Sequence, residues 1–344
     1  MKVEQFPDRV IEIDQEQYLY FGGTAYLGLP TNTAFRDLVV QNILNWGTTY
    51  GSSRTANIQL TAYDAGESFL ASHIGSESSV TVSSGMLAGK LVLEKLKKQT
   101  DCFYHLNEIH SAIQMENSFP VFVNEKLNER LLDLKSEKIT ILTDGVPSFQ
   151  TKPVDLSFLK QISNQKEITL VVDESHSLGI AGENGSGIYA SIPFSIKRKI
   201  LVSSLGKAFG LTGGVIASDP EFIKEIKEIE TFTSAAGMNP AFVQTISDAS
   251  EIYAKQHQKL KDNLSYLDSI LNENSNIKFD KNYPLIYLLS NDLVEKLKQE
   301  KIIIASFKYT KDSEPLNRIV VTANHLKEDL DKLAGILNEF NSQF

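Results

Sequence analysis

Short apolar runs alternate with helical patterns through the first two thirds of the chain. The runs are "DCFYHL", "KITILTDG", "EITLVVDESH", "RKILVSSLG" and "GGVIAS". Between them lie stretches such as "AGKLVLEKLKKQ", whose apolar positions recur three or four residues apart, as in a helix. Strands that alternate with helices predict a mostly parallel sheet covered on both faces, which is a doubly wound α/β fold. In such sheets ligands gather at the carboxyl ends of the strands.

The two ends of the chain have a different pattern of predicted strands and helices. Residues 1–33 contain the strand-like "VIEIDQEQYLYF" and the punctuating "GGTAYLGLP", which together predict an extended N-terminal arm. After about residue 240 a long helical pattern leads to "PLIYLLS", "KIIIASF" and "RIVVTA", and then to the helical "LKEDLDKLAGILNEF". This order predicts a separate α+β unit. We therefore expect an arm at 1–33, a large domain at 34–245 and a small C-terminal domain at 246–344.

Composition narrows the class of protein. The 344 residues are 42% hydrophobic and 22% charged, with a net charge of −9 and no basic block, so we expect no nucleic-acid partner. The single cysteine, Cys102, excludes an internal disulfide framework and fits a reducing compartment. The N-terminus lacks a signal-peptide core, and no apolar run has membrane-spanning length. We expect a soluble cytoplasmic protein without a membrane partner.

Three predicted strands end in residues that carry chemistry. Asp144 ends "ITILTD", Asp173 and His176 follow "ITLVV", and Ser204 and Lys207 follow "ILVS". The 34 residues from Asp173 to Lys207 suffice for one crossover helix and one strand, so both groups can lie on one rim of the sheet. An acid, an imidazole and a lysine on one rim indicate a reactive site.

Other interpretations of these residues remain open. A strand-end aspartate followed by Ser-His could simply cap a turn. A metal site is a second option, with Asp173, Glu174, His176 and His110 as potential ligands, but the chain has no H-x-x-x-H or H-E-x-x-H pair. A Walker-type phosphate loop is excluded around Lys207, because "LVSSLGKA" does not fit that pattern. We therefore expect no metal.

A phosphate site is indicated by "SSGMLAGK", residues 83–90, which follows a strand ending in "VTV" and opens a helix. Free backbone amides at such a helix start hold phosphate, although an ordinary strand–helix turn has the same pattern. A phosphate site, a carboxylate for a ring nitrogen, an imidazole and a lysine together suit pyridoxal 5′-phosphate. Lysine provides the amine for its Schiff base, and the carboxylate keeps the pyridine nitrogen protonated.

With these motifs in place, the sequence resembles the α-oxoamine synthase family of fold-type I pyridoxal-phosphate enzymes, which includes 8-amino-7-oxononanoate synthase and 2-amino-3-ketobutyrate–CoA ligase. The resemblance runs from "YLYFGGTAYLGLP" to "NRIVVTANHLKEDLDKL", and its most specific part is "VVDESHSLGIAGENGSG" followed by "SSLGKAFGLTGG". It implies a large doubly wound domain, a smaller C-terminal domain, and condensation of an amino acid with an acyl-CoA. It also implies a homodimer with active sites at the interface.

The resemblance assigns roles around the cofactor ring. Lys207 would form the Schiff base, Asp173 would pair with the pyridine nitrogen, and His176 would contact the phenolic oxygen. His110, in "NEIHSAI", falls where the family stacks a histidine on the ring. Lys207, His110 and Asp173 are therefore the expected catalytic residues.

The resemblance also assigns residues to the phosphate and to the substrate. Ser204 and the amides of Gly85 and Met86 would bind the phosphate. The segment beside the ring, "TDGVPSF", supplies Asp144 and Ser148. Arg318 would grip the carboxylate of the amino acid, a bidentate task that suits a guanidinium, although a surface arginine at a strand start would fit as well.

Three departures from the family pattern fall near the expected substrate site and near the expected edge of the dimer. Thr24 in "TAYLGL" stands where the family has asparagine near the substrate, and Tyr63 stands where a histidine is expected. Residues 234–241, "SAAGMNPA", replace a segment that offers a threonine to the neighbouring subunit's phosphate. We expect acyl-CoA condensation, with transamination by a class I/II aminotransferase and a low-turnover cofactor-binding protein as the alternatives.

Overall fold

The computed structural model describes residues 1–106, 109–192, 196–308 and 315–341. The chain forms two compact units, Met1–Arg36 with Glu251–Phe344, and Asp37–Ser250. The predicted division into an arm at 1–33 and domains at 34–245 and 246–344 stays a prediction.

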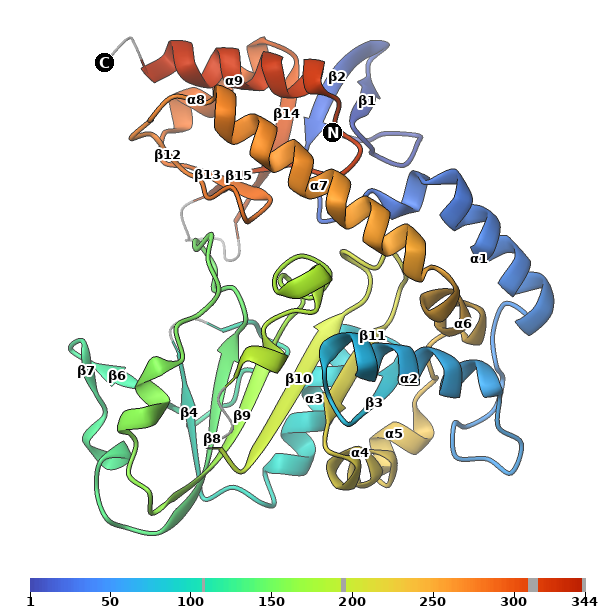
Figure 1. Ribbon diagram of the computed structural model, residues 1–344, viewed down its shortest axis with the longest axis vertical. Helices are drawn as coiled ribbons and strands as arrows, with labels where there is room; N and C mark the ends of the chain where they lie inside the picture. The colour runs from blue at the N-terminus through green and yellow to red at the C-terminus, as the bar shows by residue number, and fades with distance from the viewer. Residues whose placement is uncertain (107–108, 193–195, 309–314, 342–344) are drawn as a thin grey trace. The chain divides into compact units, whose positions relative to one another are not determined.

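The larger unit is built on a seven-stranded sheet (Figure 1). Its strand order is β3 (Ser78–Val82), β11 (Gly214–Ser218), β10 (Arg198–Ser204), β9 (Lys166–Asp173), β8 (Glu137–Asp144), β4 (Cys102–His105) and β5 (Phe119–Pro120). Neighbouring strands from β10 to β5 pair in parallel, whereas β11 is antiparallel to both its neighbours. The predicted mostly parallel α/β sheet is confirmed.

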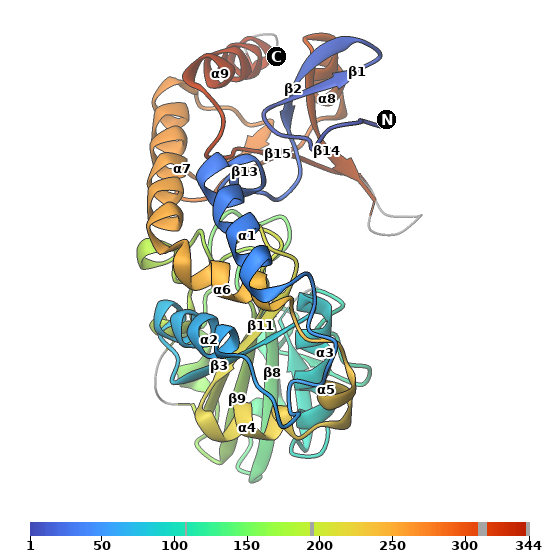
Figure 2. The ribbon, with the colours of Figure 1, turned by 90° about the vertical axis from the view of Figure 1, so that its right-hand side faces the viewer.

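Helices cover both faces of this sheet, and Figure 2 shows α2 (Thr61–Ile74) and α3 (Gly85–Leu96) on opposite sides of it. The other helices of this unit are α4 (Pro220–Lys227), α5 (Glu230–Ser234), α6 (Pro240–Asp248) and most of α1 (Thr33–Trp46). A two-stranded ribbon, β6 (Phe122–Val123) with β7 (Lys126–Leu127), lies outside the main sheet. None of the described helices is long and apolar enough to cross a membrane.

The central strands are apolar on both faces because each face has its own core. In β9, Val171 packs into the cluster formed with α3 and α4, while Leu170 and Val172 pack into the opposite cluster. Successive side chains of a strand point to opposite faces, so a continuous apolar run is what a doubly covered strand needs. Burying each such side chain contributes about 1.5–3 kcal/mol.

The crossover from β9 to β10 differs from the prediction of a helix. Its described residues form two short 3₁₀ turns, Glu183–Gly185 and Tyr189–Ser191. The physical reason lies in four glycines with positive φ, a backbone conformation that an α-helix does not use: Gly179, Gly182, Gly185 and Gly187. Consequently residues 179–187 form a compact loop, closed by hydrogen bonds from the N–H of Gly179 to Gly185 O and from the N–H of Gly187 to Ala181 O.

The smaller unit contains a six-stranded sheet. Its order is β1 (Val10–Ile13), β2 (Glu16–Phe21), β14 (Ile302–Phe307), β15 (Leu316–Val320), β13 (Leu285–Leu288) and β12 (Ile277–Lys278). Its helices are α7 (Ser250–Ile270), which begins one residue before the unit, α8 (Asn291–Gln299) and α9 (Lys327–Asn341). Strand β2 pairs in parallel with β14, so the N-terminal segment is an integral part of this sheet.

Candidate functional site

The amine of Lys207 contacts an imidazole at the carboxyl rim of the larger sheet. Lys207 follows β10, His176 follows β9, and Lys207 Nζ lies 2.9 Å from His176 Nε2. The two turns pack tightly, since a Cβ added to Gly179 would lie 2.5 Å from the Cβ of Ala208. A side chain larger than hydrogen at position 179 would therefore force the turn of His176 away from the turn of Lys207.

Two carboxyl groups end neighbouring strands beside this pair. Asp144 and Asp173 are the last residues of β8 and β9, and they are direct partners in the parallel register. Facing residues of a parallel pair present their side chains on the same face, about 5 Å apart. Two charges at that separation repel by about 3 kcal/mol at an effective dielectric constant of about 20.

The two carboxyls differ in their surroundings. Asp173 is only 6% exposed, and its Oδ1 accepts a hydrogen bond from the backbone N–H of Ser175 at 2.9 Å. The Oδ1 of Asp144 accepts from the backbone N–H of His110 at 3.2 Å. Burial raises the pKa of Asp144 from 3.8 to about 7, and the charge of Asp173 adds to the increase. Asp144 is thus the carboxyl of the pair that holds a proton near neutral pH.

The ring of His110 is half exposed and lies over this rim. Its Nδ1 is 3.7 Å from Asp173 Oδ2, and it also accepts the backbone N–H of Ala112 at 3.3 Å. A nitrogen that accepts a hydrogen bond carries no proton, so the hydrogen bond and an ion pair with Asp173 exclude each other. The hydrogen bond is the closer of the two contacts.

A cradle of backbone groups forms where β3 passes into α3. Ser84 caps the helix through its Oγ, which accepts the N–H of Leu87 at 3.1 Å. The amides of Gly85 and Met86 occupy the first turn, where N–H groups have no intrahelical acceptor. A Cβ added to Gly85 would lie 2.9 Å from Ser204 backbone and side-chain atoms. Ser204 itself accepts the N–H of Gly206 through its Oγ at 3.3 Å.

Two neighbours of Asp173 support this rim, and the sequence did not assign them these roles. Ser175 Oγ accepts the N–H of Ser204 at 2.9 Å and so joins the ends of β9 and β10. Glu174 is fully buried, and its Oε2 accepts from Ser177 Oγ and from the N–H of Ile188, both at 2.8 Å. Burial raises the pKa of Glu174 to about 7. The only signal for them was their position in "DESH".

Of the remaining predicted residues, Met86 is 43% exposed and Ser148 is half-buried, and both belong to the larger unit. Thr24 and Arg318 belong to the smaller unit. Arg318 is 7% exposed on β15, and its Nε has no hydrogen-bond partner among the described residues. A buried guanidinium that lacks a partner for one donor is suited to bind a carboxylate from outside the chain.

The residues of the larger unit fit pyridoxal phosphate. There is no room for a Cβ at Gly85, and the amides of Gly85 and Met86 lie in the first turn of α3, where an N–H has no intrahelical acceptor and can bind a phosphate. Asp173 is a buried carboxylate, which suits a protonated ring nitrogen, and Lys207 supplies an amine on the same rim. Among the described residues no group of three or more His, Cys, Asp or Glu side chains could hold a metal ion.

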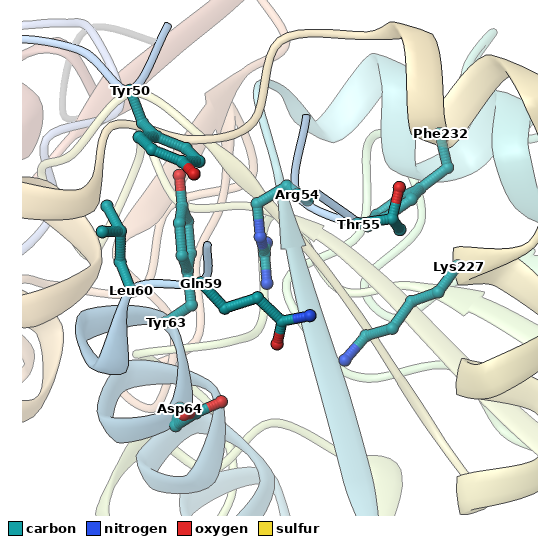
Figure 3. Close-up of a pocket in the computed structure, with 9 residues that line it drawn as sticks. All are labelled: Tyr50, Arg54, Thr55, Gln59, Leu60, Tyr63, Asp64, Lys227 and Phe232. Carbon is teal, nitrogen blue, oxygen red and sulfur yellow. The ribbon is translucent and has the colours of Figure 1, made fainter. Parts of the chain in front are cut away.

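A separate polar pocket lies between α2, α4 and the loop at 50–60 (Figure 3). Figure 3 shows Arg54, Gln59 and Lys227 projecting into the same space. The guanidinium of Arg54 stacks on the ring of Tyr63, 3.6 Å from its centroid, and donates to Glu67 at 2.8 Å. Arg54 Nη1 also donates to the carbonyl of Thr81 at 3.0 Å, so the guanidinium is anchored within the protein.

Comparisons with known proteins agree with this geometry. Residues 53–337 match the family model described as aminotransferase class I and II. The 8-amino-7-oxononanoate synthase of Petrotoga mobilis is 25% identical over 344 aligned positions, covering 93% of this chain and 88% of that protein.

Solved structures share the fold. Serine palmitoyltransferase from Sphingomonas wittichii superposes with a TM-score of 0.80 at 18% identity, covering 97% of this chain and 90% of that one. A serine palmitoyltransferase variant from S. paucimobilis with a bound PLP–myriocin aldimine gives 0.80 at 18% identity, covering 99% and 92%. At this level of identity the likeness concerns the fold alone.

Proposed function

The chain belongs to the aminotransferase class I and II family, and from this premise we propose that it is a pyridoxal-phosphate-dependent acyltransferase of the α-oxoamine synthase type. It would condense an amino acid with an acyl-CoA. The observation that carries the proposal is the contact of Lys207 Nζ with His176, on the rim where Asp173 is buried. The similarity to an 8-amino-7-oxononanoate synthase over nearly the whole chain favours condensation.

Pyridoxal phosphate, when bound, supplies an electron sink that stabilises negative charge at the α-carbon of an amino acid. Lys207 provides the amine that holds the cofactor and that moves the α-proton at Nζ. His176 would position that amine and contact the phenolic oxygen of the bound cofactor. Asp173 would keep a proton on the ring nitrogen, and His110 would cover the ring.

The remaining residues bind and orient. Ser204 and the amides of Gly85 and Met86 would hold the phosphate, and Ser148 would lie beside the ring. In the smaller unit, buried Arg318 takes the carboxylate of the amino acid, and Thr24 contributes to the same substrate site. The unsatisfied Nε of Arg318 supports this role among the described residues.

Transamination is the second candidate, because the family model is that of the aminotransferases. The fate of the α-carbanion depends on neighbouring groups, so the cofactor residues do not discriminate between the two reactions. A thiol-release assay over amino acids and acyl-CoAs, run beside an amino-transfer assay with keto acids, separates them. Amino transfer without thiol release would overturn the condensation proposal, and neither activity would favour a low-turnover binding protein.

The cofactor assignment is tested by visible absorbance of the purified protein after addition of pyridoxal phosphate. Wild type should develop a visible band and, after borohydride reduction, a covalent mass increment on Lys207. Lys207→Ala should show neither, and Lys160→Ala, at an exposed lysine of the same unit, should behave as wild type. A visible band that persists unchanged in Lys207→Ala would contradict the assignment.

The same proposal includes a homodimer in the cytoplasm. Val40 and Leu44 are 57% and 81% exposed and lie one turn apart on α1, an apolar stripe that suits a contact with a second copy. Cys102 is buried and free, as a reducing compartment allows. Light scattering should give twice the mass of the 38.3 kDa chain, and Leu44→Glu should shift it toward the monomer. A monomeric wild type would refute this part of the proposal.

A further inference from the structure

Asp144 is the titratable group of the rim that the proposed chemistry leaves without a task. It faces Asp173 across the β8–β9 register, and among the described residues its carboxyl accepts one hydrogen bond, from the backbone N–H of His110. Two adjacent, largely buried carboxylates with so few donors cannot both be ionised without cost. One of the two carboxyl groups therefore keeps a proton until a further positive charge binds beside them.

The other charged and titratable groups on this rim set which carboxyl keeps it. Asp173 accepts the N–H of Ser175 at 2.9 Å. Lys207 lies on the β10 side, where its positive charge favours an ionised Asp144, and its Nζ contacts His176. Glu174 lies on the far side of Gly145, whose added Cβ would be 3.3 Å from Glu174 Cγ. His110 contributes its backbone N–H. Burial and the charge of Asp173 outweigh these effects, so the proton stays on Asp144.

We infer that Asp144 and Asp173 work as a pair that holds one proton, which leaves Asp144 when a pyridine ring binds against Asp173 with a proton on its nitrogen in the complex. This inference rests on the proposed cofactor site. In this step the protonated carboxyl of Asp144 becomes a carboxylate, and its proton passes to solvent or to the ring nitrogen. Asp144 is thus a positioning residue. By losing its proton it makes the site one charge more negative when the positively charged ring binds.

The proton count on binding tests this role without any enzymatic activity. The full-length protein, freed of cofactor, is titrated calorimetrically with pyridoxine 5′-phosphate, in buffers of different ionisation enthalpy. This ligand carries the ring nitrogen and the phosphate but no aldehyde, so it cannot condense with Lys207. On binding the ligand near pH 7, wild type should release up to about one proton more than Asp144→Asn. The difference is the same whether the ring takes its proton from Asp144 or from solvent. Asp155→Asn, an exposed carboxylate beyond the same strand, should match wild type.

A second measurement uses the infrared band of protonated carboxyl groups, to which buried Glu174 also contributes. Near pH 6 this band should lose intensity in wild type when pyridoxine 5′-phosphate binds, and it should lose less in Asp144→Asn. Binding with equal proton counts in wild type and Asp144→Asn, or with the band unchanged, would overturn the inference. Failure of the ligand to bind wild type at all would instead count against the proposed cofactor site.

Discussion

Lys207 Nζ lies 2.9 Å from His176 Nε2, although 30 residues separate them in the chain. The contact exists because β9 and β10 are parallel neighbours, so the turns that follow them leave the sheet at the same rim. Tight packing between Gly179 and Ala208 then fixes how close the two turns come.

Replacing His176 should therefore slow the capture of pyridoxal phosphate by the amine. In His176→Ala the amine loses a hydrogen-bond partner worth about 1–1.5 kcal/mol, so the visible band should form about tenfold more slowly. His176→Gln retains an acceptor within reach and should recover part of the rate. Stopped-flow absorbance measures both, and equal rates in His176→Ala and wild type would show that the contact does not prepare the amine.

Gly85→Ala should weaken phosphate binding. The added methyl would lie 2.9 Å from Ser204 Cα, Cβ and N, closer than Cβ contacts allow, so the cradle must widen. We expect at least a tenfold loss in affinity for pyridoxine 5′-phosphate, equivalent to about 1.4 kcal/mol. Gly51→Ala is the matched control, because an added Cβ there meets no atom within 4 Å. Calorimetry compares the two, and equal affinities would place the phosphate elsewhere.

Asp144→Asn should stabilise the cofactor-free protein at alkaline pH. The folded state raises the pKa of Asp144 from 3.8 to about 7, so wild type loses stability as pH rises through that window. Asparagine can still accept the N–H of His110 and carries no charge. At about pH 8 the variant should be more stable by about 2–4 kcal/mol, while at about pH 4 the two should be nearly equal. Urea unfolding at both pH values measures the difference, and an effect independent of pH would contradict it.

The sequence was sufficient to predict the sheet and the strand ends because both depend on local patterns. The run "EITLVV" is apolar on both faces and matches β9, and Asp173 follows it directly. The antiparallel direction of β11 was not predictable in this way, because an apolar run carries no sign of strand direction. The turns in the described part of the crossover were predictable in principle from the four glycines, which favour turns over a helix.

The features that were not predictable from the sequence depend on contacts between residues that are distant along the chain. Ser175 is bonded to Ser204, 29 residues away, and nothing in either motif indicates the pair. The same holds for the departures at Tyr63 and at 234–241, which are separate in the sequence but meet in the structure. Tyr63 Oη donates to the carbonyl of Met238 at 2.8 Å, and a Cβ on Gly237 would lie 3.2 Å from that hydroxyl.

This meeting of two departures makes Tyr63→Phe the most direct probe of segment 234–241. Burial raises the pKa of Tyr63 above its ordinary value of 10.0, so the hydroxyl stays a donor to Met238 O. Phenylalanine keeps the ring beneath Arg54 but leaves that buried carbonyl unpaired, which should cost about 1–2 kcal/mol of unfolding free energy. Tyr50→Phe is the control, because its bond to Ile58 O is exposed and its loss should cost less than about 0.5 kcal/mol. Hydrogen exchange of the segment should rise in Tyr63→Phe alone. Similar unfolding free energies for the two variants would show that the segment is held by packing of Met238 against Gly213 instead.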